Sequence, residues 1–520
     1  MEKNPGFLFC GENHAKSHIF FFLFKSLFSE GFLPRGVPSS AIAEGISTES
    51  KSAGSKMRSQ PSKGSVGFMY LLLTSFTVCL NPTSAWSPSV TISSPRSIHP
   101  RANTMRMSIA ERQADEMMKQ EPLPKKTILT KNIKQADPIP EAGILQAVEI
   151  MQQGKLYRYN VPTAEESMVS IVEKEVGEYT GHKYVVGLNS CGSALFLALK
   201  AAGVQPGDKV LTNAFTFTAV PSAIEHSGGE AVYVETEAGF RIDVDDLEMK
   251  MKSSGARFLM VSHMRGKIAD MDAIVELCDK YGVYLIEDAA HSIGVLWNGK
   301  HTGHHGRIAA ISSQSYKMLN SGEGGFLITN DPEAGAAVAV YAGAYEALHV
   351  KHLAVPDASF FGDLSNQLPN YSLRMHAVTA AMIRPQIATI DERRERYNVR
   401  YYKMAERLNA LPGVSVPEQL PQVTIVGDSV QFTLASASAT EIERFMNSCN
   451  VRNLPVELFG DDKNARYFKN WKFAPADCEL PQTERIIKST LDVRMPLMWD
   501  DSDFDDMYAA IVESLTEAGI

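Results

Sequence analysis

The sequence predicts an α/β protein with a mostly parallel sheet in a large domain, followed by a smaller C-terminal α+β domain. From about residue 140 onward, short apolar runs rich in β-branched side chains alternate with helical stretches. This alternation is typical of βαβ units, in which helices cover both faces of parallel strands. With 44% hydrophobic and 21% charged residues, the chain of 520 residues also has the composition of a globular protein with a core.

An apolar run near the start of the chain predicts a targeting signal. Phe68–Leu80 contains 13 residues, fewer than the roughly 20 that a membrane span needs. Basic residues precede this run, and the small residues Thr83-Ser84-Ala85 follow it, as in the cleavage region of a secretory signal peptide. We therefore expect a signal peptide at 57–85. Residues 86–110 contain Ser and Arg but no Asp or Glu, which predicts a transit peptide.

A signal peptide followed directly by a transit peptide resembles the bipartite presequences of algae with complex plastids. This resemblance implies a plastid location; the secretory pathway and the cytoplasm are the alternatives. Because a signal peptide acts from the N-terminus, we expect translation to begin at Met57 and residues 1–56 to be a gene-model artefact. The alternative interpretation of residues 1–110 is a disordered tail that contains one core helix.

Charge and cysteine content exclude several classes of protein. The net charge is −9, although residues 51–110 contain seven Lys or Arg and no acidic residue, so the body of the chain is strongly acidic. An acidic body argues against nucleic acid or an anionic membrane as a partner. Six cysteines without a C-x-x-C pair argue against a disulfide scaffold and a structural zinc site, and no metal site is predicted. We expect no membrane span in the mature protein.

The body begins after a predicted linker at 111–137, with a large domain at 138–385. Apolar β-rich runs predict strands at Tyr184–Leu188, Lys209–Thr212, Ala231–Val234, Phe258–Ser262, Val283–Ile286, Ile308–Ile311 and Phe326–Thr329. Helices are predicted between and before them at Glu165–Tyr179, Ser193–Ala202, Val220–His226 and Asp270–Tyr281. Residues 386–520 form the predicted small domain, with one long charged helix at Ile387–Leu411, strands at Val430–Leu434 and Val493–Pro496, and helices at Thr440–Asn447 and Phe504–Leu515.

Polar groups follow three of the predicted strands, where parallel α/β sheets bind their ligands. The turn Asn189–Ser193 offers backbone N–H groups at the start of a helix, which suits a phosphate. Asp288 is followed by two alanines, which leave room for a flat ligand. Lys317 lies between two strands beside a glycine-rich loop, where desolvation would lower its pKa and make it a nucleophilic amine. Taken singly, each feature has an ordinary structural explanation as a helix cap, a tight turn or a surface charge.

Together these groups match the needs of pyridoxal 5'-phosphate. That cofactor requires an amine for a Schiff base, a carboxylate beside the pyridine nitrogen, an aromatic face and an anion site. Lys317, Asp288, Phe217 and the turn containing Cys191, Gly192 and Ser193 would supply them in that order. The carboxylate would keep the ring nitrogen protonated, so that the ring accepts the electrons released when the substrate Cα loses its proton.

Four blocks of the chain resemble the DegT/DnrJ/StrS family of pyridoxal phosphate-dependent sugar aminotransferases. The blocks are NSCGSALFLAL at Asn189–Leu199, NAFTFTAVPSAI at Asn213–Ile224, EDAAHS at Glu287–Ser292 and SSQSYKMLNSGEGG at Ser312–Gly325. The resemblance covers residues 138–518. It implies an aspartate-aminotransferase-like, fold-type I homodimer with shared active sites. It also implies transfer of an amino group, usually from glutamate or glutamine, to a keto sugar, a keto cyclitol or a similar ketone.

The resemblance also assigns roles to individual residues. Lys317 would form the Schiff base and move the proton, Asp288 would pair with the ring nitrogen, and His291 would lie near the phenolic oxygen. Of the remaining residues, Phe217 would stack on the ring and Ser312 would bind phosphate with Cys191, Gly192 and Ser193, whereas Gln314 and Glu323 are secondary candidates near Lys317. His263 matches a histidine of the family at a strand end, but a hydrogen bond that merely holds the strand end is an equal alternative.

Departures from the family pattern concern the substrate more than the cofactor. Cys191-Gly192 replaces the usual Gly-Thr at the phosphate turn, and a packing role for Cys191 is favoured over a reactive thiol. The motif that binds the phosphate of the partner subunit is stretched over Asn370–Met375, which leaves the reach of Asn370 open. The stretch Tyr341–Leu368 is distinctive. A diphosphate would need a basic cluster, and the candidates Arg241, Arg265, Lys267 and Lys300 are scattered along the sequence.

Two other functions remain as alternatives. One is a dehydratase or lyase of the same family, although dehydratases of the family carry histidine in place of the lysine retained here as Lys317. The other is a non-catalytic, regulatory protein that binds the cofactor.

Overall fold

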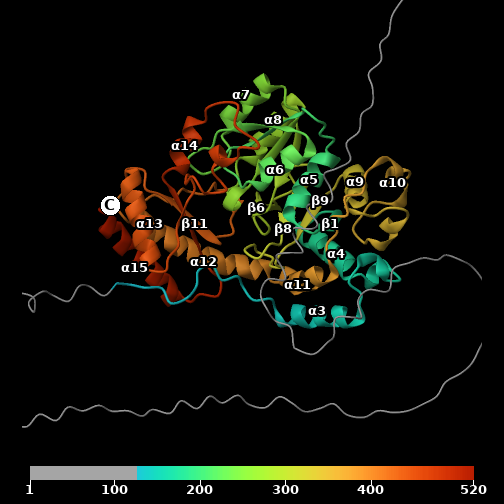
Figure 1. Ribbon diagram of the computed structural model, residues 1–520, viewed down its shortest axis with the longest axis horizontal. Helices are drawn as coiled ribbons and strands as arrows, with labels where there is room; N and C mark the ends of the chain where they lie inside the picture. The colour runs from blue at the N-terminus through green and yellow to red at the C-terminus, as the bar shows by residue number, and fades with distance from the viewer. Residues whose placement is uncertain (1–125) are drawn as a thin grey trace, which may run out of the picture. The chain divides into compact units, whose positions relative to one another are not determined.

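The computed structural model describes residues 126–520 (Figure 1). Its main sheet has seven strands in the order β1-β9-β8-β5-β4-β2-β3. β9 is antiparallel to its neighbours β1 and β8, whereas every other neighbouring pair is parallel. The mostly parallel sheet is thereby confirmed. The strands are β1 (Tyr184–Leu188), β2 (Lys209–Asn213), β3 (Glu230–Val234), β4 (Phe258–Ser262), β5 (Tyr284–Asp288), β8 (Ile308–Ser312) and β9 (Gly325–Thr329).

Helices cover both faces of this sheet because side chains alternate along each buried strand. Val185 of β1 belongs to a core with α4 (Met168–Thr180), α7 (Val244–Ser254), α8 (Met271–Tyr281) and α11 (Ala377–Ile387). Its neighbour Val186 points to the other face and joins a core with α5 (Cys191–Ala201), α6 (Ala219–Ser227) and α9 (Pro332–Ala342). A strand buried on both faces reads as a continuous apolar run, which is why these strands were predicted to within two residues at each end.

The C-terminal part contains a smaller antiparallel sheet in the order β11-β13-β12. Its elements are β11 (Ser429–Thr433), β12 (Glu457–Leu458), β13 (Thr490–Arg494), α12 (Ile390–Asn409), α13 (Ala439–Val451), α14 (Pro481–Ile487) and α15 (Asp501–Ala518). Phe432, Phe445 and Ile511 are completely buried in the core between this sheet and the helices. A third sheet, β10-β6-β7, pairs β10 (Val423–Thr424) with β6 (Leu296–Trp297), which in turn pairs with β7 (Lys300–His301).

The long charged helix predicted at Ile387–Leu411 is confirmed as α12, which begins three residues later, at Ile390, and ends two residues earlier, at Asn409. A short break separates it from α11, which ends at Ile387. Ile387 and Ile390 are both buried, and the hydroxyl of Thr389 donates a hydrogen bond to the carbonyl of Gln386 at 3.0 Å. The break lets α11 pack against α3 (Glu141–Gln153) and α4, whereas α12 packs against β11 and α15 (Figure 1).

Residues 126–137, within the stretch predicted to be a linker, pack against the C-terminal part. Leu129 and Ile133 are buried in its core, and Thr127 Oγ1 donates a hydrogen bond to Glu513 at 2.6 Å. This segment therefore stabilises the small domain as well as joining the chain. The predicted presequence, residues 1–110, lies outside the described residues.

The remaining helices are short: η1 (Arg158–Asn160), η2 (Ala164–Glu166), η3 (Met264–Gly266), η4 (Leu348–Lys351), η5 (Ala358–Phe360), α10 (Leu364–Gln367) and η6 (Phe468–Asn470). Between residues 126 and 520, no helix has the length and apolar character to cross a membrane.

Candidate active site

A cavity of about 560 Å³ lies at the carboxyl ends of the parallel strands. Lys317 and Asp288 both line it, so the two groups on which the predicted chemistry depends share one site. Eight of the predicted cofactor residues line this cavity: Cys191, Gly192, Phe217, Asp288, His291, Ser312, Gln314 and Lys317. They come from the turns after β1, β2, β5 and β8, as expected for a ligand site of a parallel sheet.

Lys317 is held beside His291. Its Nζ lies 2.7 Å from Nε2 of His291. Burial, together with the charge of Arg265, lowers the pKa of Lys317 to about 7. Burial and the charge of Lys317 also hold the pKa of His291 well below its ordinary value, so the imidazole is neutral. A large fraction of Lys317 is therefore a neutral amine near pH 7, which is the form that attacks a carbonyl.

Asp288 is the last residue of β5, and a chain of hydroxyl groups holds it. Thr216 donates to the hydroxyl of Ser262 at 2.7 Å, and Ser262 donates to Oδ2 of Asp288 at 2.7 Å. The backbone N–H of Ala290 donates to Oδ1 at 3.1 Å. Burial nevertheless raises the pKa of Asp288. In the described part of the chain, the buried carboxylate of Asp288 lacks a strong cationic partner. It therefore favours a ligand that brings a positive charge.

The turn after β1 forms the start of α5. Ser190 caps this helix, because its Oγ accepts the N–H of Ser193 at 3.1 Å. The Ser193 hydroxyl donates to Asn189 at 2.7 Å, and Ser193 does not line the cavity. Ser193 therefore helps to build the turn, and its predicted contact with the cofactor stays a prediction. Gly325 allows the close approach of β9, since a Cβ there would lie 2.6 Å from the backbone nitrogen of Cys191.

The Cys191 side chain fits a packing role. It is half-buried, and burial, with the nearby Asp288 carboxylate, raises the pKa of its thiol above the ordinary value. A thiol with a raised pKa is a poor nucleophile at neutral pH.

The other predicted cavity residues form its walls. Phe217 is 41% exposed, which is unusual for a phenylalanine and leaves its ring available to stack on a ligand. Ser312 is buried at the end of β8, and its Oγ accepts the N–H of Gln314 at 3.3 Å. Glu323, a secondary candidate, also lines the cavity.

His263 points away from the cavity. Its Nε2 lies 2.9 Å from Oε2 of Glu287. The same Oε2 accepts the backbone N–H of Gly303 at 2.8 Å, and Oε1 of Glu287 accepts the backbone N–H of His305 at 2.8 Å. Glu287 and Asp288 are consecutive in β5 and therefore point to opposite faces of the sheet. Of the two interpretations of His263, the structure favours the hydrogen bond that holds the strand end.

Asn370 also lies outside the cavity of its own chain. Its Oδ1 accepts the N–H of Ser372 at 2.7 Å. Its predicted contact with the phosphate of a partner subunit stays a prediction.

A cluster of arginines that the sequence motifs did not indicate lines the cavity. Arg265, Arg466 and Arg494 lie after β4, after β12 and at the end of β13. Arg265 is one of the four scattered basic residues named above, whereas Arg466 and Arg494 are not among them. Arg265 precedes the other two by about 200 residues or more in the sequence, and the three meet only in the folded chain. Their positions at or after strand ends are the only sequence signal that could have indicated them.

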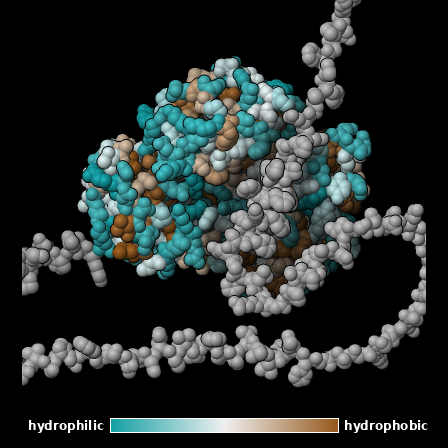
Figure 2. Space-filling view, in the orientation of Figure 1, coloured by the Kyte–Doolittle hydropathy of each residue, from teal (hydrophilic) through white to brown (hydrophobic). Residues whose placement is uncertain are grey.

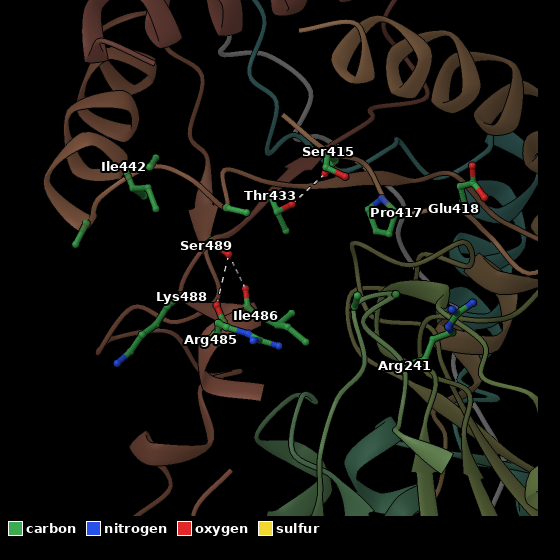
Figure 3. A pocket seen from close by; sticks show the side chains of 15 residues that line it. Arg241, Ser415, Pro417, Glu418, Thr433, Ile442, Arg485, Ile486, Lys488 and Ser489 are labelled. Atoms are coloured by element: carbon green, nitrogen blue, oxygen red, sulfur yellow. Dashed lines mark hydrogen bonds between the residues drawn. The ribbon is translucent and has the colours of Figure 1, made fainter. Parts of the chain in front are cut away.

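A larger cavity, of about 810 Å³, lies elsewhere and contains neither Lys317 nor Asp288 (Figure 3). Small residues such as Ala435 and Ala437 line it, and Arg241 and Arg485 lie on different sides of it. The Ser489 hydroxyl lies within hydrogen-bonding distance of the backbone carbonyls of Arg485 and Ile486. The lining of this larger cavity places no nucleophile beside a base, so the smaller cavity is the candidate active site.

The residues of the smaller cavity fit pyridoxal 5'-phosphate. Lys317 would hold its aldehyde carbon, Asp288 its ring nitrogen and Phe217 its ring face. Ser312 and the N–H groups at Cys191 and Gly192 would hold its phosphate, because the N-terminus of a helix favours an anion. Gly192 leaves this end open, since the nearest atom to a Cβ placed there would be the Ser190 Oγ at 3.8 Å. When bound, the cofactor supplies an electron sink for the carbanion of the substrate.

Comparison with known proteins agrees with this site. The sequence model of the DegT/DnrJ/EryC1/StrS aminotransferase family matches residues 146–512. The spore coat polysaccharide biosynthesis protein SpsC of Bacillus subtilis (strain 168) is 27% identical over 354 residues, which are 65% of this chain and 87% of that protein. The 3-amino-5-hydroxybenzoate synthase of Amycolatopsis mediterranei (strain S699) is 29% identical over 288 residues, which are 55% of this chain and 69% of that protein.

Solved structures show the same fold. The aminotransferase TlmJ from Streptoalloteichus hindustanus superimposes with a TM-score of 0.64 at 21% identity, over 74% of this chain and 99% of that one. The family match spans most of the chain and includes every residue that lines the cavity except Lys134. This protein therefore belongs to the DegT/DnrJ/EryC1/StrS aminotransferase family and is a pyridoxal phosphate-dependent aminotransferase.

Proposed function

We propose that the protein transfers an amino group from an amino acid, glutamate or glutamine, to a keto sugar, a keto cyclitol or a similar ketone. One observation carries this proposal: the amine of Lys317 and the carboxylate of Asp288 line the same cavity. The names of the relatives support the acceptor class. One relative is named as a spore coat polysaccharide biosynthesis protein, and another as a 3-amino-5-hydroxybenzoate synthase.

The residues of the chain divide the work of the reaction. Lys317 would hold the cofactor and would move the proton at the substrate Cα. His291, neutral and 2.7 Å from the amine, orients Lys317. Asp288 would keep the ring nitrogen of the cofactor protonated, and Ser262 keeps Asp288 in place through its hydrogen bond of 2.7 Å.

A dehydratase or lyase of the same family is the second candidate. Retention of Lys317 favours transamination, because the dehydratases of the family that this chain resembles carry histidine at that position. A non-catalytic regulatory role is disfavoured, since the amine, the carboxylate, the aromatic face and the anion site are all present.

Absorbance of the reconstituted enzyme tests the function. Mixing with pyridoxal 5'-phosphate is expected to give the visible band of a lysine-bound cofactor, and glutamate or glutamine is expected to bleach it. The matched control is Lys472→Ala, a change at an exposed lysine outside the cavity that should keep the band, whereas Lys317→Ala should lose it. A wild-type enzyme without the band, or a Lys317→Ala variant that keeps it, would contradict the proposal.

Analysis of the products separates the two reactions. Transamination yields one keto acid for each amino acid consumed, and the amine remains on the protein until a ketone is added. Release of ammonia or water from the acceptor without a keto acid would favour the dehydratase or lyase.

We also propose that the protein forms a homodimer with shared active sites, as membership of the family suggests. Helix α3 exposes Ile144, Leu145, Val148 and Met151, each of which is at least 39% exposed. Figure 2 shows hydrophobic surface in the region of α3 and α11. Burial of such surface is the main driving force for association.

The mass in solution tests this proposal. Light scattering after gel filtration should give twice the mass of one chain for the wild type and for Glu149→Gln, an exposed change on the same helix. Leu145→Glu should shift the protein toward the monomer. A monomeric wild type would refute the homodimer.

We further propose that residues 57–110 direct the protein to a complex plastid. Support comes from the short apolar run and from the acid-free stretch rich in serine and arginine that follows it. A fluorescent protein placed behind residues 57–110 should accumulate in the plastid of a cell that has one. Fluorescence in the secretory pathway or the cytoplasm would contradict this location.

A further inference from the structure

The arginine cluster, which consists of Arg265, Arg466 and Arg494, lines the same cavity as Lys317. The Arg265 side chain is only 3% exposed and the Arg466 side chain 15%. Arg265 also has a φ of 56°, in the left-handed region, so its backbone is held in a conformation that costs energy. Three buried or half-buried guanidinium groups in one cavity require an explanation, because a desolvated charge is costly without a partner.

Carboxylates of the chain satisfy only part of this cluster. Arg265 pairs with Asp492, and Arg466 donates to Glu457 at 2.9 Å. Within residues 126–520, the Nε atoms of Arg265 and Arg466 are nevertheless buried without a hydrogen-bond partner. The carboxylates of the chain therefore leave part of the hydrogen-bonding capacity of these two guanidinium groups unused, although both residues line the cavity.

Arg494 is the least compensated of the three. In the described part of the chain its guanidinium forms no ion pair, and it lies over the ring of Tyr316, with Cζ 4.4 Å from the centroid. The aromatic ring fixes the guanidinium plane but does not neutralise its charge. Arg494 therefore keeps its hydrogen-bond donors for a ligand.

The charges of the cluster act close to the reacting amine. Together with burial, the charge of Arg265 lowers the pKa of Lys317, and all three arginines lower the pKa of His291. Burial and the charge of Arg265 also lower the pKa of Arg466 to about 10. Since the three arginines and Lys317 line one cavity, an anion bound by the cluster shares that cavity with the reacting amine.

The cofactor phosphate does not use the arginine cluster, because it is assigned to the turn at Cys191 and Gly192 and to Ser312. A guanidinium group binds a carboxylate with two hydrogen bonds, so the cluster suits the carboxylate of an amino donor. Because the acceptor enters the same cavity after the donor has left, the same guanidinium groups are then available to an anionic group of the acceptor.

We propose that the keto acceptor itself carries an anionic group, a carboxylate or a phosphate, near its ketone, and that Arg466 and Arg494 bind this group. The inference rests on the proposed function and narrows its substrate class to anionic ketones. The chemistry balances without a further reactant: the CH–NH2 of the donor becomes C=O, and the C=O of the acceptor becomes CH–NH2.

Binding of matched ketones tests this proposal without turnover. The protein is loaded with pyridoxine 5'-phosphate, which carries neither an aldehyde nor an amine and therefore reacts with neither Lys317 nor a ketone, and calorimetry measures the binding of three probes. D-Fructose is neutral, 2-keto-D-gluconate differs from it by a carboxylate next to the ketone, and D-fructose 6-phosphate carries a phosphate. We expect at least one anionic probe to bind 10-fold or more tightly than D-fructose, and the tighter of the two tells carboxylate from phosphate.

Variants assign the effect to the cluster. Arg494→Gln should reduce the affinity for the anionic probe to that for D-fructose, whereas Arg494→Lys, which keeps the charge, should retain most of it. Arg444→Gln, on the exposed side of α13, is the matched control and should change nothing. Equal binding of the three probes, or tight anion binding that survives Arg494→Gln, would overturn the inference. Failure of the proposed function is recognised separately, by the absence of the visible band with pyridoxal 5'-phosphate.

Discussion

Capture of the cofactor aldehyde by Lys317 is predicted to be half-maximal near pH 7. Burial, with the charge of Arg265, lowers the pKa of this amine from an ordinary 10.5 to about 7. At pH 7 about half of the Lys317 side chains are therefore neutral, compared with roughly one in 3,000 for an unperturbed lysine. Because only the neutral amine attacks the aldehyde, the rate of cofactor capture rises with pH and becomes constant above about pH 7.5–8.

The assay mixes cofactor-free protein with pyridoxal 5'-phosphate between pH 5.5 and 10 and follows the visible band in a stopped-flow instrument. Lys317→Ala is the control for bands formed on surface lysines. A rate that keeps rising about tenfold per pH unit up to pH 10 would show an ordinary lysine and would refute the argument from burial.

Three substitutions test other parts of the structure. Asp288→Asn removes the charge beside the ring nitrogen and should lower the transamination rate constant about 10- to 1,000-fold; single-turnover kinetics at the wild-type rate would contradict this. Ser262→Ala removes a hydrogen bond to the Asp288 carboxylate worth about 1.5–3 kcal/mol, so its rate loss should grow as the pH is lowered, whereas a pH–rate profile parallel to that of the wild type would count against it. Glu173→Gln breaks a fully buried ion pair with Arg158 and should cost about 3–5 kcal/mol of unfolding free energy; an unchanged urea midpoint would be the opposing result.

Most of the main sheet could be predicted because its strands are buried on both faces. Val185 and Val186 pack into different cores, so both positions must be apolar and the strand reads as one continuous run. The break between α11 and α12 could not be predicted in this way. It depends on the side to which Ile387 and Ile390 turn, and that is set by elements far away in the sequence.

The same distinction between local patterns and distant contacts applies to the residues of the active site. Asp288 and Lys317 lie within short motifs directly after strands, so their meeting follows from the parallel topology. The direction in which a side chain points is harder to predict. His263 and Ser193 both lie close to strand ends, where ligands bind. Glu287 nevertheless holds His263 on the other face of the sheet. Asn189 and Ser190 hold Ser193 in the turn.

Arg466 and Arg494 illustrate the part that sequence patterns do not contain. Each is an isolated arginine in a segment without a motif, and an isolated arginine is usually a solvated surface charge. Their significance arises only when the C-terminal sheet packs beside the cavity and places both side chains in its wall. Contacts between segments that are distant in the sequence therefore form the arginine cluster, whereas local motifs indicate the cofactor.

The most direct test of the account is to locate the covalent bond to the cofactor. The protein loaded with pyridoxal 5'-phosphate is reduced with borohydride, digested and analysed by mass spectrometry. The account predicts that the reduced cofactor is attached to Lys317 at close to one group per chain. Attachment spread over several lysines, or a modified site other than Lys317, would contradict it.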